Sequence, residues 1–500
     1  MFKNIVKMSS FEKDDIFTIF LNNHKTYNNH KMNTKDFRKN AHELVEWMAD
    51  YMENIENQRV TPDIQPYELY KQLPEVPPQK GEPFENIFAD FKNLIVPNMT
   101  HWQHPTFFAY FPANSSPPSV LAEMLTATLA SQCMVWQTSP AAAELEEMMM
   151  NWLADLCGLP KTWHGVIQDT ASTATLCAIL TAREKYSNFA INENGFENQP
   201  NFTFYCSAET HSSADKALKI AGLGKKSLKK VAVDEAFAMK PAELESMILA
   251  DKAAGLVPLC VMANIGTTSS TAIDPLQEIA EICVRHGIWL HVDAAYAGTA
   301  TMLPEQRHLI KGLEMADSYV FNPHKWMFTN FDCTAYYVKD KTALIQTFEI
   351  LPEYLKTSAD SKVNNYRDWG VQLGRRFRAL KLWFVMRSYG VEELQNKIRK
   401  HLELAQNFAE RLRNAQKYEI LAPISLNLIC FRYKPEGIVD ETMLENLNTK
   451  LLQNLNLTGK VYLTHTKLNK KYVIRLVIGQ TNVEQRHLDL LWELLEEYTK

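Results

Sequence analysis

The sequence of 500 residues lacks any uninterrupted apolar run of the roughly 20 residues that a membrane-spanning helix needs. Its longest apolar stretch, AAGLVPLCVMANIG at 253–266, is broken by a proline and by polar residues, so it is predicted to be a buried strand. The N-terminal MFKNIVKMSSFEKDD has no sustained apolar core and acquires acidic residues early, which argues against a secretory signal peptide. We therefore expect a cytoplasmic protein that does not enter a membrane.

The sequence also lacks an excess of basic residues and an ordered pattern of cysteines. Lys and Arg total 53 against 58 Asp and Glu, and the net charge of −5 leaves no basic field for nucleic acid. The eight cysteines are scattered, with no CxxC pair and no metal-like spacing, which is typical of reduced, buried thiols in a cytosolic protein. Neither a GxGxxG nor a Walker motif is present. We expect no metal and no nucleic-acid partner.

The hydrophobic pattern divides the chain into four segments. Residues 1–33 are rich in Asn, Lys and His without periodicity, which predicts a mobile extension. Residues 34–118 begin with a helical pattern and continue with proline-rich sequence, which predicts a helical and partly extended arm. Residues 119–382 alternate helix-like segments with short apolar runs, which is typical of a mostly parallel sheet covered on both faces. Residues 383–500 predict a smaller α+β domain.

Short apolar runs are predicted to be strands, and longer periodic segments to be helices. The strands are expected at 201–208, 255–266, 287–294, 317–322, 333–338, 426–433 and 471–479. The helices are expected at 36–57, at 141–159, at 391–415 and from about residue 483.

Two candidate catalytic residues stand at the ends of neighbouring predicted strands. Asp293 ends the apolar run in WLHVDAAYAG, and Lys325 follows DSYVFN within FNPHKWMFTN, an aromatic and apolar setting in which a lysine is unusual. Carboxyl ends of parallel strands meet at one edge of a sheet, and an amine held there can lose its proton and attack a carbonyl. Taken alone, each has a commoner structural explanation, Asp293 as a turn or helix-capping residue and Lys325 as a surface lysine paired with an acid.

Two further features complete a pattern. In GVIQDTASTATLCAILTA, at 165–182, a strand-like GVIQ runs into a cluster of helix-capping residues, and free N–H groups at such a helix start suit a phosphate. His211, in SAETHSSADKA, follows a strand, although a lone histidine is more often structural. Together, the phosphate-binding helix start, the acid, the amine and the histidine match the needs of pyridoxal phosphate.

From about residue 34 onward the chain resembles the group II pyridoxal-phosphate-dependent amino acid decarboxylases, and most closely the aromatic-L-amino-acid decarboxylases. The resemblance is carried by HWQHPTFFAYFP, SPAAAELEEMMMNWL, WLHVDAAYAG, NPHKWMFTNFDC and LGRRFRALKLWFVMRSYG. It implies the α/β fold type I of PLP-dependent transferases, as in aspartate aminotransferase. It also implies a homodimer that has its active site at the interface and an N-terminal arm that wraps the partner subunit. It also implies conversion of an aromatic L-amino acid, such as Phe, Tyr, DOPA or Trp, to the amine and CO₂.

The resemblance implies a role for each matching residue. Lys325 would hold the cofactor as a Schiff base, and Asp293 would pair with the pyridinium nitrogen. His211 would stack on one face of the ring, with Ala295 on the other. The other cofactor contacts would be Ala171, Ser172, Thr268, Asn322 and His324. Tyr354, in PEYLK, would donate the proton that completes the amine, and the substrate-binding positions would be Tyr110, Ala113, Met134 and Gly374.

Two positions separate neighbouring activities within the resemblance. Relatives that form aldehydes by decarboxylation with oxidative deamination typically have Phe at position 354 or Asn at position 211, so Tyr354 and His211 favour amine formation. Histidine-specific relatives tend to have Ser at position 374, where Gly374 leaves room for a phenyl or indole ring. An aromatic aldehyde synthase, a histidine decarboxylase and a catalytically silent homologue are the alternatives.

Three departures from the resemblance concern the surroundings of the site. Asp169 stands where many relatives have glycine, and an acid beside a phosphate is unfavourable unless it points away or caps the helix. Ala113 replaces a common threonine, and Met134 stands where relatives often have phenylalanine. These changes bear on substrate preference more than on reaction type.

Overall fold

The computed structural model describes residues 32–350 and 362–499, and the described chain forms two compact units that divide after Thr100. The first unit begins with α2 (Thr34–Glu53), whose N-cap Asn33 accepts hydrogen bonds from two N–H groups, while the Asp36 carboxylate accepts one from the Asn33 N–H. Its other helical segments are Ile55–Asn57, Tyr70–Gln72, α3 (Phe84–Asp90), Phe91–Ile95 and Val96–Asn98. Six prolines between positions 62 and 83 account for the absence of a longer helix in that described stretch.

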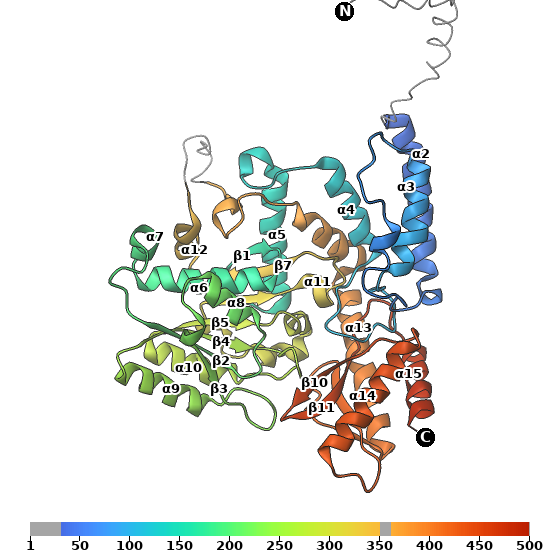
Figure 1. Cartoon of the computed structure of the whole chain (residues 1–500). Helices are drawn as coiled ribbons and strands as arrows, with labels where there is room; N and C mark the ends of the chain where they lie inside the picture. The colour runs from blue at the N-terminus through green and yellow to red at the C-terminus, as the bar shows by residue number, and fades with distance from the viewer. Residues whose placement is uncertain (1–31, 351–361, 500) are drawn as a thin grey trace, which may run out of the picture. The chain divides into compact units, whose positions relative to one another are not determined.

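The second unit contains a sheet of seven described strands in the order β1-β7-β6-β5-β4-β2-β3 (Figure 1). Strands β3, β2, β4, β5 and β6 are parallel, whereas β7 is antiparallel to both of its neighbours. The strands are β1 (His164–Gln168), β2 (Phe202–Ser207), β3 (Leu228–Val231), β4 (Val257–Asn264), β5 (Trp289–Asp293), β6 (Ser318–Phe321) and β7 (Thr334–Val338). The predicted mostly parallel sheet is confirmed.

Helices cover both faces of this sheet, so its central strands are buried except at Val257, the first residue of β4. Side chains alternate between two cores: in β7, Tyr336 packs with α6 and α8, whereas Tyr337 packs with α5 and α10. The helices are α4 (Pro117–Leu129), α5 (Pro140–Cys157), α6 (Ala171–Tyr186), α7 (Ala190–Asn194), α8 (Ser213–Ile220), α9 (Pro241–Ala253), α10 (Leu276–His286), α11 (Pro323–Trp326) and α12 (Lys341–Phe348). The short 3-10 helices are Trp136–Thr138, Lys225–Ser227, Ala297–Met302, Pro304–Ile310, Leu313–Met315 and Tyr366–Asp368.

The C-terminal part of the second unit has its own antiparallel sheet and hydrophobic core. Strands β8 (Tyr418–Ile420), β9 (Leu428–Tyr433), β10 (Thr464–Leu468) and β11 (Lys471–Val477) lie in the order β10-β11-β9-β8, with helices α13 (Arg378–Asn414), α14 (Glu441–Leu457) and α15 (Gln485–Tyr498). Helix α13 bends at Gly390, where φ is 71°. The predicted domain boundary at 382/383 lies within this helix. No helix in the described ranges is long and apolar enough to cross a membrane.

Candidate active site

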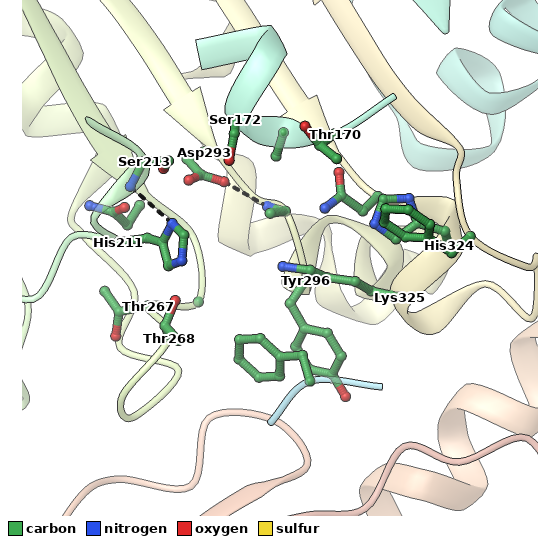
Figure 2. A pocket seen from close by; sticks show the side chains of 17 residues that line it. Thr170, Ser172, His211, Ser213, Thr267, Thr268, Asp293, Tyr296, His324 and Lys325 are labelled. Carbon is green, nitrogen blue, oxygen red and sulfur yellow. Dashed lines mark hydrogen bonds between the residues drawn. The ribbon is translucent and has the colours of Figure 1, made fainter. Parts of the chain in front are cut away.

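A cavity opens at the edge of the large sheet where β2, β4, β5 and β6 end (Figure 2). This edge is where open α/β sheets bind ligands, because the loops after parallel strands diverge there. All nine residues predicted to bind the cofactor line it. The lining residues are Phe111, Thr170, Ala171, Ser172, His211, Ser213, Asn264, Gly266, Thr267, Thr268, Asp293, Ala295, Tyr296, Asn322, His324, Lys325 and Phe331.

Lys325 lies in α11, the single helical turn that Pro323 begins after β6. Its Nζ is 5.4 Å from the centre of the Phe111 ring, and no carboxylate oxygen in the described part of the chain lies within 4 Å of it. Burial lowers the pKa of this amine, and the charge of Asp293 only partly opposes the effect. Lys325 is therefore a half-buried lysine whose amine gives up its proton more easily than that of a surface lysine.

A stack of aromatic rings supports the turn that carries Lys325. The Tyr296 ring lies 3.9 Å from Phe111 and 4.9 Å from Trp326, nearly parallel to both. The Tyr296 hydroxyl accepts a hydrogen bond of 2.6 Å from the Asn427 side chain, and the Trp326 indole donates one of 2.9 Å to His401. The C-terminal part of the chain thus holds the ring of Tyr296 and the indole of Trp326, the residue that follows Lys325.

Asp293 ends β5 and points into the cavity (Figure 2). One carboxylate oxygen accepts the N–H of Ala295 at 2.9 Å, and only 8% of the residue is exposed. Within the described ranges the carboxylate has no ion-pair partner, so its second oxygen can accept a further hydrogen bond. This arrangement suits a protonated ring nitrogen.

His211 follows β2 and lies on the same side of the cavity as Asp293 (Figure 2). The N–H of Ser213 donates to its Nδ1 at 3.1 Å, which places the ring proton on Nε2. Burial and, to a smaller extent, Lys325 lower the pKa of His211, while Asp293 raises it. The side chain is therefore a neutral, flat ring with a fixed tautomer at neutral pH.

Several hydrogen-bond donors converge on the other side of the cavity. Helix α6 begins there after its N-cap Thr170, and the N–H groups of Ala171 and Ser172 have no acceptor among the described residues. His324 accepts the Cys333 N–H on Nδ1 at 3.0 Å, and burial lowers its pKa to about 3, so its Nε2 carries the proton as a neutral donor. These donors and the helix dipole suit a phosphate.

Asn322 adds an amide group to these donors. Its side-chain oxygen accepts the Thr334 hydroxyl at 2.9 Å, which leaves the amide N–H groups for a ligand. Thr268 approaches the cavity from the loop after β4, and its carbonyl accepts a hydrogen bond of 2.7 Å from the buried guanidinium of Arg475.

Asp169, the unexpected acid before α6, does not line this cavity. Its Oδ1 accepts the Thr170 N–H at 2.6 Å, and its Oδ2 accepts the Gln372 side-chain amide at 2.8 Å. Both carboxylate oxygens are therefore engaged outside the cavity, so the acid is not aimed at a ligand in it.

The four predicted substrate-binding residues are not among the residues lining the described cavity. Tyr110 packs against the rings of Trp102 and Tyr462. The carbonyls of Ala113 and Met134 accept hydrogen bonds from Gln103 and Arg367, and Gly374 lies against Gln132. Tyr354 lies outside the described residues.

Sequence reasoning missed several lining residues, among them Phe111, Asn264, Thr267 and Tyr296. Asn264 ends the apolar strand β4, which is the signal that identified Asp293 one strand away. Phe111 lies in a proline-rich loop without periodicity, so no sequence pattern marks it.

Comparisons with known proteins agree with this geometry. Residues 66–434 match the family model described as the pyridoxal-dependent decarboxylase conserved domain. The chain belongs to the pyridoxal-dependent decarboxylase family.

Named relatives cover nearly the whole chain. A phenylacetaldehyde synthase of Petunia hybrida is 41% identical over 93% of this chain and 95% of the relative, and a tyrosine decarboxylase of Papaver somniferum is 40% identical over 93% and 94%. The crystal structure of Catharanthus roseus tryptophan decarboxylase in complex with L-tryptophan superposes with a TM-score of 0.88 at 40% identity, covering 94% of this chain and 99% of that one.

This decarboxylase is a carboxy-lyase that uses pyridoxal phosphate, and its cavity fits that cofactor. The amine of Lys325, with its lowered pKa, suits the aldehyde, and the accepting oxygen of Asp293 suits the ring nitrogen. The N–H groups at the start of α6 suit the phosphate.

Proposed function

We propose that this decarboxylase acts on an aromatic L-amino acid of the Phe, Tyr, DOPA or Trp type and releases the corresponding amine and CO₂. The observation that carries the proposal is the cavity that gathers Lys325, Asp293, His211 and the start of α6. Two of the relatives above are named for tyrosine and tryptophan, which supports an aromatic substrate. The resemblance, in which histidine-specific relatives tend to have Ser at position 374, supports it too.

When bound, pyridoxal phosphate supplies an aldehyde for amines and a protonated ring that accepts the electrons of a breaking bond. Lys325 is the residue that would hold the aldehyde, since burial favours its unprotonated amine. Asp293 would keep the proton on the ring nitrogen. Its carboxylate accepts one backbone N–H at 2.9 Å, which leaves the other oxygen to accept a hydrogen bond from the protonated nitrogen. His211 would cover one face of the ring and Ala295 the other.

The phosphate would bind to Ala171, Ser172, Asn322 and His324, with Thr268 beside the cofactor. We assign Tyr354 the proton that reaches the substrate Cα after CO₂ leaves, as a general acid. Tyr110, Ala113, Met134 and Gly374 would shape the substrate pocket.

An aromatic aldehyde synthase is the second candidate, because one relative is named phenylacetaldehyde synthase. Tyr354 and His211 favour the amine over the aldehyde. Replacing Tyr354→Phe is expected to divert product from amine to aldehyde, because Cα then lacks its proton donor and is oxidised by dissolved O₂, which is reduced to hydrogen peroxide while ammonia is released. Amine, aldehyde, ammonia and hydrogen peroxide are measured together, and an unchanged amine yield removes Tyr354 from the mechanism.

We also propose a homodimer with the active site at the interface. Helix α4 exposes a row of large apolar side chains within its own unit: Leu121, Met124, Leu125 and Leu129. The predicted substrate-binding residues lie outside the cavity of one chain, as expected if a second copy contributes them. Light scattering of the purified protein is expected to give twice the chain mass, and a monomer with full activity would contradict this arrangement.

A cytoplasmic location agrees with the cysteines, since all eight are free and buried.

The function is tested with a panel of phenylalanine, tyrosine, DOPA, tryptophan, 5-hydroxytryptophan and histidine, with amine and CO₂ measured for each. The Lys325→Ala variant serves as the blank. Equal amounts of amine and CO₂ from an aromatic substrate support the proposal, and turnover of histidine alone would overturn it.

A further inference from the structure

Three consecutive residues at the end of β1 hold a distant segment, residues 369–375. The Ile167 carbonyl accepts a hydrogen bond of 3.0 Å from the Arg375 guanidinium, and the Gln168 amide donates one of 2.8 Å to the Trp369 carbonyl. Asp169 accepts the third, of 2.8 Å, from the Gln372 side chain. The first two contacts are buried, whereas the third is exposed and joins two side chains.

The Asp169–Gln372 pair lies next to the proposed phosphate position. Thr170 follows Asp169 directly and caps α6, and the unpaired N–H groups of Ala171 and Ser172 come next. A carboxylate this close to a phosphate repels it unless the carboxylate is turned away. The hydrogen bond from Gln372 is the contact that holds Oδ2 of Asp169 in the turned-away position.

We propose that Gln372 is a positioning residue for cofactor retention, because it keeps the Asp169 carboxylate away from the cofactor phosphate. The inference rests on the proposed placement of the phosphate at the start of α6. Without Gln372, the Asp169 carboxylate keeps only its contact with the Thr170 N–H, and its released Oδ2 can turn towards the phosphate, where the negative charge weakens phosphate binding. Removing that charge as well restores binding.

The test compares cofactor release from the holoenzyme of wild type, Gln372→Ala, Asp169→Asn and the double variant, followed by visible absorbance. Gln372→Ala is expected to release pyridoxal phosphate roughly fivefold faster, the factor that a lost hydrogen bond to a charged group and a modest repulsion produce. The double variant is expected to release it at nearly the wild-type rate. A loss of packing alone would not be relieved by the second substitution.

Two controls separate the pair from other effects. In α10, the Gln277 side-chain amide donates a similar exposed hydrogen bond of 3.1 Å to the Glu281 carboxylate. Gln277→Ala removes it and is expected to leave the rate of cofactor release unchanged. Protein reconstituted with pyridoxal, which has no phosphate, is expected to release it at one rate in all variants. Equal release of pyridoxal phosphate from wild type and Gln372→Ala, or a double variant as fast as Gln372→Ala, overturns the inference.

Failure of the underlying site has a different signature. If wild type released pyridoxal and pyridoxal phosphate at the same rate, the phosphate would not be held at α6, and the proposed site would be wrong before any variant is compared. A second measurement uses hydrogen exchange. Adding pyridoxal phosphate is expected to slow amide exchange in residues 369–375 of wild type more than of Gln372→Ala, because coupling between two sites acts in both directions.

Discussion

The chemistry of Lys325 depends on what surrounds its amine. A lysine in water is protonated at neutral pH and does not attack carbonyls, whereas burial beside Phe111 lowers its pKa. Asp293 contributes the opposite property, since it remains an accepting carboxylate with one oxygen held by the Ala295 N–H. An amine with a lowered pKa and a carboxylate that can accept a further hydrogen bond thus lie in the same cavity.

We expect Asp293→Asn to lower decarboxylation about 100-fold or more, because an amide does not stabilise a positive ring nitrogen. Asp317→Asn is the matched control, since Asp317 also accepts one backbone N–H at 2.9 Å but lies before β6, at the other end of that strand. The decarboxylation rate of each variant is measured as CO₂ release at a saturating concentration of cofactor. Equal losses in the two variants would contradict a special role for Asp293.

Sequence alone could find residues that follow apolar strands but not those placed by tertiary contact. Lys325, Asp293 and His211 each come after a buried run, so their shared edge of the sheet was predictable. Phe111 and Tyr296 face the cavity because they stack on each other across 185 positions of sequence. The partner of Asp169, Gln372, was equally beyond prediction, because the contact joins loops 203 residues apart.

Among the elements, strands with continuous apolar sequence were predictable, and strands with mixed sequence were not. Strands β2, β4, β5, β6 and β7 lie within the predicted ranges because both faces of the sheet are covered. Strand β3 reads LKKV and was missed, since it is an edge strand whose lysines reach solvent. The antiparallel direction of β7 leaves no trace in its composition.

The start of α6 is the element on which phosphate binding depends. Thr170 caps it by accepting the Thr173 N–H, so we expect Thr170→Ala to lower the free energy of unfolding by about 1 kcal/mol. Thr170→Ser keeps the hydroxyl and is expected to retain most of the stability. Urea unfolding of the three proteins measures the difference. Identical stabilities of the alanine and serine variants would show that this cap does not stabilise the helix.

Across the whole second unit, the C-terminal core and the cofactor cavity are joined through a buried polar contact. His401 of α13 accepts the Trp326 indole N–H, and Trp326 follows Lys325. Burial lowers the pKa of His401 to about 3 from an ordinary value of 6.5, so the folded protein keeps this histidine neutral.

This burial predicts a dependence of stability on pH. Between pH 6.5 and 3 the unfolded chain binds a proton at His401 that the folded chain does not, so stability falls as the pH falls. From pH 7 to pH 5, the free energy of unfolding of wild type is expected to fall by about 2 kcal/mol more than that of His401→Asn, a variant that keeps an acceptor for Trp326. Other titrating groups, such as Asp274, whose pKa is raised to about 6 by burial, contribute equally to both proteins, so their contributions cancel in the comparison. Parallel urea curves at pH 7 and pH 5 measure this difference, and equal losses would contradict a neutral His401.

The attachment of the cofactor to Lys325 is tested most directly by borohydride reduction. The holoenzyme is reduced and digested, and the peptides are weighed by mass spectrometry. We expect one phosphopyridoxyl group per chain, on the peptide that contains Lys325, and none after Lys325→Ala. A label on any other lysine, such as the buried Lys381 of α13, or no label at all, would contradict it.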